Sequence, residues 1–298
     1  RGTPDGAQGT SCRIGLPATC TQAGEPGPLE FKGRPLARGL TIGYHRDLPG
    51  GWGDFQVAHE EQLFGIPTEL DNSTAVLTEP LSICLHAALN SPPLPDEPVL
   101  IIGSGPIAMG TVWALRALGY GGTLVVQAKR FKEGHLALAF GATEVVKPGL
   151  GAREAMVDTG AKAYLPLVGP EVYAGGGFPL IYDCVGSRES LNQALRFASP
   201  RGKVVVLGCA SRLGRVDLTF LWARELEVVG SVGYGRERWE GGEWHTFEIV
   251  RELLLNTDAP VSRMVTHLFP LDQYKDALKA ASNRKLSGAM KVVLTPKK

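Results

Sequence analysis

The sequence predicts an α/β protein in which a parallel sheet carries helices on both faces. From residue 99 onward, short apolar runs that suit buried strands alternate with segments of helical periodicity. A glycine-rich turn follows the first of these runs directly, and the proline-rich segment SPPLPDEP at 91–98 precedes it. Together these observations indicate a doubly wound sheet of the Rossmann type, entered from an earlier, loop-rich part of the chain.

The bulk composition is that of an ordinary globular protein. The chain has 298 residues, of which 44% are hydrophobic and 20% are charged. Its 31 Lys and Arg against 30 Asp and Glu give a net charge of +1, so neither nucleic acid nor an anionic membrane is expected as a partner. No apolar run approaches the roughly 20 residues of a membrane span, and the first residues lack a signal-peptide core. We therefore expect a cytoplasmic enzyme.

The cysteines do not suggest a disulfide framework, because there are five of them and they stand far apart. Cys84, Cys184 and Cys209 lie inside apolar runs, where we expect them to act as small buried hydrophobic residues. The chain starts at Arg1 in a stretch rich in Gly and Pro. We take this start as a sign that the sequence is N-terminally incomplete.

Each element follows from its local pattern. Residues 1–50 predict loops, 52–67 predict two short strands, and apolar residues at helical spacing predict a helix over 70–89 with Pro80 near its start. Strands of the sheet are predicted at 99–102, 123–126, 144–146, 180–185, 203–207 and 226–230. Helices are predicted at 106–118, 132–140, 190–197, 244–255 and 271–281, the last between two final strands.

The turn after the first strand has the pattern G-x-G-x-x-A. Gly103 permits the tight turn, Gly105 lets the backbone approach a diphosphate, and Ala108 is small enough for close packing of helix on strand. With Pro106 and Ile107, these residues open a helix whose free N–H groups and positive dipole end attract phosphate. A glycine triplet alone also fits an ordinary strand–helix turn. The complete strand–turn–helix–strand context favours dinucleotide binding.

The end of the second strand indicates which dinucleotide is bound. Many NAD enzymes place Asp or Glu there to bind the ribose 2′-hydroxyl, whereas this chain has Gln127, Ala128, Lys129 and Arg130. The two basic residues suit a 2′-phosphate, so NADP is favoured over NAD. The alternative is that Lys129 and Arg130 are simply solvated side chains at the end of a strand.

From about Cys12 to its C-terminus the chain resembles the medium-chain dehydrogenase/reductase family, the group of zinc-type alcohol, sorbitol and threonine dehydrogenases. The resemblance rests on TEPLSICLHAAL, VLIIGSGPIAMG, FGATEVV, IYDCVGSRESLNQAL, PRGKVVVLG and LSGAMKVVL. It implies a Rossmann cofactor domain at 83–258, inserted into a β-rich, GroES-like catalytic domain of which 1–82 and 259–298 form a part. It also implies a homodimer or homotetramer.

The resemblance implies further site residues. Glu79 would be a ligand of a catalytic zinc, although an acid at a helix start also favours the local dipole. Along the cofactor we expect Asp183, Val185, Gly186 and Ser187 on the adenosine side, and Leu207, Gly208, Cys209, Ser231 and Val232 toward the nicotinamide. Lys291 would reach the diphosphate, unless it is only a charge at a strand edge.

Two departures from the family pattern concern metals. The first Cys and His ligands of the catalytic zinc would precede the start of this chain, and His45, His59 and His86 do not stand at their positions. In the structural-zinc lobe, Cys12 and Cys20 keep the last spacing, but Gly6 and Gly9 replace the other two thiols. We therefore expect no structural zinc, because such a closed site takes four ligands.

The resulting hypothesis is an oxidoreductase that moves hydride between NAD(P) and an alcohol, ketone or polyol, assisted by zinc in the intact enzyme. Three alternatives stay open at this point: a zinc-free quinone or enone reductase of the same superfamily, a non-catalytic NADP-binding protein, and a degenerate or truncated chain without activity. The identity of the substrate cannot be read from the sequence, because fold alone does not fix it.

Overall fold

The computed structural model describes residues 13–15, 30–31, 34–35, 50–53, 63–209 and 212–296. The expectations for Cys12, Cys20, His45 and His59 lie outside these residues. In the N-terminal part, β1 (Arg13–Gly15) pairs with β4 (Phe64–Ile66), and β2 (Glu30–Phe31) pairs with β3 (Arg34–Pro35). Among the helices described, none has the length and apolar character needed to cross a bilayer.

A six-stranded parallel sheet confirms the predicted fold class. Its strands are β5 (Val99–Ile102), β6 (Leu124–Gln127), β7 (Glu144–Val146), β10 (Phe178–Asp183), β11 (Ala198–Val206) and β12 (Glu227–Gly230). They lie in the order β12-β11-β10-β5-β6-β7. The first strand thus stands in the middle and the chain winds outward in both directions, which is the Rossmann order.

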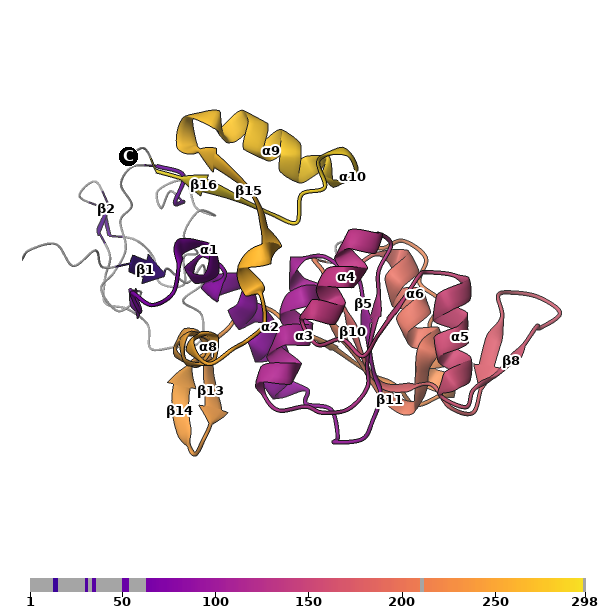
Figure 1. Cartoon of the computed structure of the whole chain (residues 1–298). Helices are drawn as coiled ribbons and strands as arrows, with labels where there is room; N and C mark the ends of the chain where they lie inside the picture. The colour runs from indigo at the N-terminus through magenta and orange to yellow at the C-terminus, as the bar shows by residue number, and fades with distance from the viewer. Residues whose placement is uncertain are drawn as a thin grey trace, which may run out of the picture.

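Helices cover both faces of this sheet (Figure 1). The strand side chains alternate in direction, so that Val99 and Ile101 enter one core while Leu100 and Ile102 enter the other. The first core also takes side chains from α2 (Thr78–Asn90), α3 (Pro106–Ala117), α4 (Phe131–Ala139) and α8 (Thr246–Leu255). The second takes them from α5 (Leu150–Asp158), α6 (Arg188–Phe197) and α7 (Thr219–Ala223).

Helix α2 joins the N-terminal part of the chain to the sheet domain. Leu77, just before it, and Leu81 and Leu85 are fully buried, and each such side chain contributes about 1.5–3 kcal/mol on burial. The helix lies very close to α3, because a Cβ added at Gly110 would stand 2.6 Å from the Sγ atom of Cys84. This packing fixes the start of α2, where Glu79 lies, relative to the start of α3.

The C-terminal segment forms a small lobe beside the sheet domain (Figure 1). In it β15 (Val265–Pro270) and β16 (Lys291–Thr295) pair in parallel, and α9 (Tyr274–Ser282) and the short α10 (Arg284–Ser287) connect them. The predicted strand–helix–strand order of this region is therefore confirmed.

The structure also differs from the predicted elements. The helix predicted at 244–255 begins at Thr246, because residues 242–245 form β14, which pairs with β13 (Arg236–Trp239) in a hairpin. Helix α5 and the hairpin of β8 (Lys162–Tyr164) and β9 (Val172–Ala174) were not predicted, since this stretch lacks a strong apolar pattern. A one-turn helix, α1 (Asn72–Ala75), precedes α2.

His245 ends β14 and caps α8, and this position makes its protonation costly. Its Nδ1 atom accepts a hydrogen bond from the backbone N–H of Phe247 at 3.1 Å, and its ring stacks on Phe64. Burial lowers the pKa of His245 from 6.5 to about 4, outweighing the opposing effect of Glu248. The neutral ring is thus favoured in the folded state, and the cap depends on it.

We expect the folded state to lose stability as the pH falls from 6.5 toward 4. The lowered pKa contributes stability that is fully present above the unfolded value of 6.5, and that contribution amounts to about 3 kcal/mol. Thermal unfolding between pH 7.5 and 4.5 measures the loss. His245→Asn keeps a capping side chain that does not titrate, so its Tm should be lower at pH 7.5 but should fall less on acidification. An equally steep fall in both proteins would assign the loss to other groups.

Candidate functional site

A crevice opens where the two halves of the sheet diverge. Strands β5 and β10 are neighbours there, but the helices that follow them, α3 and α6, cover opposite faces. Doubly wound sheets bind ligands at this switch point, beyond the carboxyl ends of the strands. The crevice has a volume of about 470 Å³. Seven of the predicted cofactor residues line it: Gly103, Gly105, Gln127, Lys129, Arg130, Val185 and Ser187.

The glycine-rich turn forms one wall of this crevice. Gly103 has φ +120°, a conformation that L side chains rarely adopt, and an added Cβ would lie 3.0 Å from Cγ2 of Val185. Gly105 caps α3 and Pro106 is the first helical residue, while Ala108 is fully buried. The N–H groups of Ile107 and Ala108, in the first helical turn, have no partner within the helix. This exposed backbone leaves space for a diphosphate, and a side chain at Gly103 or Gly105 would occupy that space.

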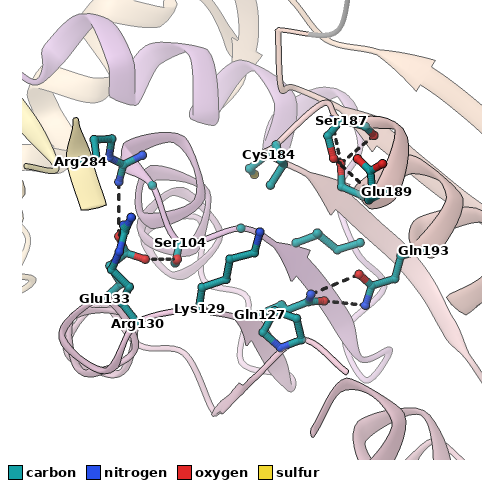
Figure 2. A pocket seen from close by; sticks show the side chains of 16 residues that line it. Ser104, Gln127, Lys129, Arg130, Glu133, Cys184, Ser187, Glu189, Gln193 and Arg284 are labelled. Atoms are coloured by element: carbon teal, nitrogen blue, oxygen red, sulfur yellow. Dashed lines mark hydrogen bonds and ion pairs between the residues drawn. The ribbon is translucent and has the colours of Figure 1, made fainter. Parts of the chain in front are cut away.

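The residues at the end of β6, which were predicted to bind the cofactor, have different surroundings. The side-chain amides of Gln127 and Gln193 bond each other in both directions, at 3.2 and 2.7 Å (Figure 2). Ala128 is buried, and its N–H donates to the carbonyl oxygen of Val146. Lys129 lines the crevice and forms no ion pair within the part of the chain that the structure describes.

Glu133 is a member of this site that the sequence analysis missed. Its side chain, in the first turn of α4, is 11% exposed, accepts a hydrogen bond from the Ser104 hydroxyl and pairs with the guanidinium of Arg130 (Figure 2). A third contact joins it to Nη2 of Arg284 at 3.5 Å. The spacing of Arg130 and Glu133 is a sequence signal for the first pair, but the contacts of Ser104 and Arg284 arise from the fold.

The loop after β10 is organised by a buried acid. Asp183 is fully buried and accepts hydrogen bonds from the N–H groups of Val185 and Gly186 and from the hydroxyl of Ser190, at 3.0–3.1 Å. Burial raises the pKa of Asp183, and these hydrogen bonds act in the opposite direction. Asp183 therefore shapes the loop from behind rather than facing the crevice. Ser187 accepts from the N–H of Ser190 and so caps α6.

The residues after β11 support this loop. The N–H groups of Leu207 and Gly208 both donate to the carbonyl oxygen of Asp183. A Cβ at Gly208 would lie 2.2 Å from the backbone N of Gly186, so only glycine permits this contact. Cys209, next in the chain, is exposed, so the expectation that it would be a small buried hydrophobic residue is wrong. These three predicted residues do not line the crevice.

The loop after β12 carries an unsatisfied polar atom. The N–H of Ser231 donates to the carbonyl oxygen of Val206, but its Oγ atom is buried and has no hydrogen-bond partner among the described residues. Val232 beside it is exposed. Buried hydroxyl groups are normally paired, so this atom is an exception among the described residues.

Glu79 and Lys291 lie apart from the crevice lining. Burial raises the pKa of Glu79, and the positive charge of Lys291 lowers it, so the two side chains affect each other. Burial also raises the pKa values of Cys84 and Cys184, which disfavours their thiolates as ligands. No group of three or more His, Cys, Asp or Glu suited to a metal occurs in the described ranges. These residues alone therefore do not fit a catalytic zinc, which takes three protein ligands.

Comparisons with known proteins agree with this geometry. Residues 106–248 match the family model described as zinc-binding dehydrogenase. The chain is 29% identical over 242 residues to L-idonate 5-dehydrogenase of Vitis vinifera and 28% identical over 248 residues to sorbitol dehydrogenase of Arabidopsis thaliana. Each alignment covers 80% of this chain, and it spans 60% and 61% of the two relatives.

A solved structure shows the same relationship in three dimensions. A protein of Sinorhizobium meliloti 1021, provisionally assigned as a zinc-binding dehydrogenase and bound to NADP, superposes with a TM-score of 0.66 at 27% identity. The match covers 87% of this chain and 69% of that one. The resemblance inferred from the motifs, and the fold that it implied, are confirmed.

We expect Gly103→Ala to damage the crevice. The change forces a side chain into a positive-φ position against Val185, so it should cost about 1–3 kcal/mol of unfolding free energy and at least about tenfold in affinity for NADPH and NADH. Chemical denaturation and fluorescence titration measure the two effects. Gly160→Ala is the matched control, since it has φ +86° with open space around it. Should Gly103→Ala bind as tightly as this control, the turn would not be the phosphate site.

Proposed function

We infer that the chain, whose residues 106–248 belong to the zinc-binding dehydrogenase family, is an oxidoreductase that moves hydride between a nicotinamide dinucleotide and an alcohol or carbonyl compound. The observation that carries this proposal is the glycine-rich turn at the switch point of the sheet, open to a crevice with basic side chains. Because the chain spans about 60% of the length of the curated relatives, the activity of the whole protein is part of the proposal.

The residues of the crevice bind and orient the dinucleotide. Backbone N–H groups at the start of α3 hold the diphosphate, and the buried Ala108 keeps that helix close to β5. Val185 and Ser187 form the opposite wall, which Asp183 holds in shape. A bound nicotinamide cofactor supplies the hydride acceptor or donor.

The substrate that we propose is a secondary alcohol or polyol, or the matching ketone. The curated relatives named for L-idonate and sorbitol support this class. Glu79 remains our proposed zinc ligand, and the metal-assisted form of the reaction stays a prediction, because one carboxylate among the described residues does not make a site. Cytoplasmic location and assembly into a homodimer or homotetramer also stay predictions.

NADP is the cofactor that we propose. The position after β6 that commonly carries an acid for the 2′-hydroxyl is occupied by the buried Ala128. Lys129 lines the crevice, and Arg130, next to it, pairs with Glu133. Lys129 has no such partner among the described residues, which leaves its positive charge for a 2′-phosphate. The NADP bound to the Sinorhizobium relative supports the same choice.

Titration followed by turnover tests the proposal. We expect the purified chain to bind NADPH, and NADH more weakly, by fluorescence titration. A panel of secondary alcohols, polyols and ketones, with zinc supplied, should then include at least one substrate that changes absorbance at the nicotinamide wavelength. Turnover of quinones or enones alone would indicate the zinc-free reductase. Tight binding without any turnover would contradict turnover by this chain and leave cofactor binding as its activity, and no binding of either cofactor would refute the assignment.

We predict that Lys129→Ala weakens NADPH binding about tenfold and leaves NADH within about twofold, because a hydrogen bond between charged groups is worth about 1.5–3 kcal/mol. Isothermal titration of both cofactors measures the difference. Lys132→Ala serves as the control, since this side chain is exposed on α4 and does not line the crevice. Equal losses for NADPH and NADH would remove Lys129 from recognition of the 2′-phosphate.

A further inference from the structure

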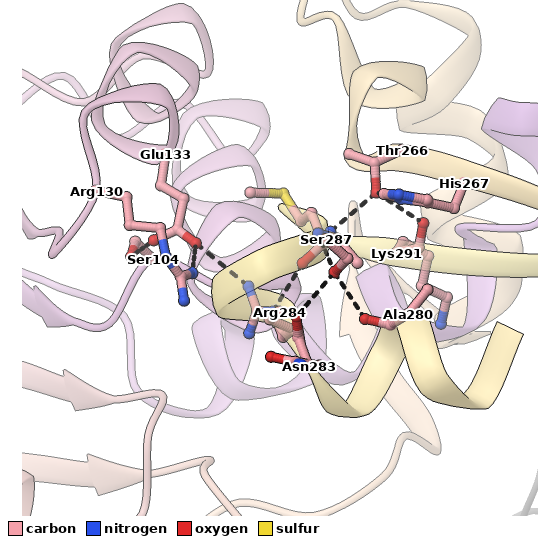
Figure 3. Close-up of polar contacts among 12 residues, drawn as sticks. Ser104, Arg130, Glu133, Thr266, His267, Ala280, Asn283, Arg284, Ser287 and Lys291 are labelled. Carbon is pink, nitrogen blue, oxygen red and sulfur yellow. Dashed lines mark hydrogen bonds and ion pairs between the residues drawn. The ribbon is translucent and has the colours of Figure 1, made fainter. Parts of the chain in front are cut away.

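Arg284 reaches the glycine-rich turn from the C-terminal lobe. Although α10 is far from the turn in sequence, the Arg284 side chain lines the crevice. A Cβ built on Gly105 would lie 3.3 Å from its Nη1 and 3.8 Å from its Nη2. Figure 3 shows the side chain extending from the C-terminal segment toward Glu133 and Ser104. The guanidinium thus lies over the backbone that would hold a diphosphate.

A compact turn holds Arg284 in this position (Figure 3). Its Nε donates to the carbonyl oxygen of Ala289 at 2.8 Å. The Ser287 hydroxyl bonds the carbonyl oxygen of Ala280 at 2.8 Å and accepts from the N–H of Ala289. Gly288, with φ +70°, closes the turn. Because the turn fixes the base of the side chain, little entropy would be lost when its guanidinium binds a ligand.

The charge arrangement around Arg284 favours an anion. The guanidinium lies beside the start of α3, where the helix dipole is also positive, so the two repel each other. The Glu133 carboxylate offsets this repulsion through its contact with Nη2 of Arg284, but it also pairs with Arg130. Within the described residues, Nη1 forms no hydrogen bond. The Arg284 side chain is 35% exposed, so an entering ligand can reach it.

We propose that Arg284 is a ligand of the cofactor diphosphate, and that Glu133 positions its guanidinium over the glycine-rich turn. The proposal rests on the proposed function, since it assigns a residue of the same cofactor site. The planar guanidinium offers two parallel N–H donors to the oxygens of a phosphate. Lys291, for which the family resemblance implied this role, does not line the crevice, and its charge acts on Glu79. The C-terminal lobe thereby contributes to binding through Arg284.

Binding measurements on Arg284→Ala test this role. The ligands are NADPH, NADH and ADP-ribose, which contain the diphosphate, and 2′-AMP, which carries a 2′-phosphate without it. We expect about tenfold weaker binding of the first three and unchanged binding of 2′-AMP, which also reports an intact fold. Arg284→Lys, which keeps the charge but not the planar fork, should fall between wild type and Arg284→Ala. Lys285→Ala, at the exposed neighbour, is the control.

The outcomes separate this proposal from the proposed function. If wild type binds NADPH or NADH but Arg284→Ala binds ADP-ribose within twofold of it, the role of Arg284 is refuted while the function stands. A loss confined to NADPH and 2′-AMP would refute it as well, because it would place Arg284 at the 2′-phosphate. If wild type binds neither cofactor, the proposed function itself fails.

Glu133→Gln tests the positioning role separately. In a double-mutant cycle with Arg284→Ala, the two changes should be coupled by at least about threefold for ADP-ribose, because each depends on the contact between them. Because Glu133 also pairs with Arg130, titration of the Glu133→Gln variant with 2′-AMP measures that separate effect. Additive effects on ADP-ribose binding would refute the positioning role of Glu133.

Discussion

The candidate site depends on a close approach of backbone to backbone at the carboxyl edge of the sheet. The loops after β5, β10 and β11 meet there with so little space that a side chain at Gly208 would overlap the backbone of Gly186. A side chain at Gly103 would press on Val185 from the other side. Asp183 makes this contact stable, since its buried carboxylate binds the N–H groups of the middle loop. The crevice has its shape because glycine and one buried acid let three strand ends come together.

Charge adds selectivity to this shape. A surface of free backbone N–H groups attracts any phosphate, and it does not tell one dinucleotide from another. Discrimination between NADP and NAD has to come from the side chains at the end of β6 and from Glu133, which pairs with Arg130 and Arg284. This acid reduces the positive charge without cancelling it. It also fixes the direction of two guanidinium groups, so its effect on cofactor choice is one of geometry as much as of charge.

The residues of the site that could be predicted from the sequence are those whose role depends only on their neighbours in the chain. The bounds of β5 and β7 were predicted correctly, because apolar runs between turns define buried strands without help from the rest of the chain. Gly103 and Gly105 could be recognised in the same way. Glu133, Gln193 and Arg284 could not, since their roles arise from contacts between segments far apart in sequence. Asp183 was expected along the cofactor, but the structure places it behind the loop. For Glu79, Ser231 and Lys291 the predicted roles stay predictions.

In this chain, cofactor binding is therefore supported by more of the described residues than the reaction of the substrate is. The groups that would hold the dinucleotide come from the ends of β5, β6 and β10 and from α10, all inside the described residues, and they line the same crevice. The group proposed to act on the substrate, Glu79, lies apart from that crevice. Cofactor binding and turnover are consequently separable properties of this chain. Contacts to the cofactor phosphates can be made in full even though the reaction of the substrate depends on further residues. Interactions remote from the reacting atoms do not by themselves stabilise the transition state.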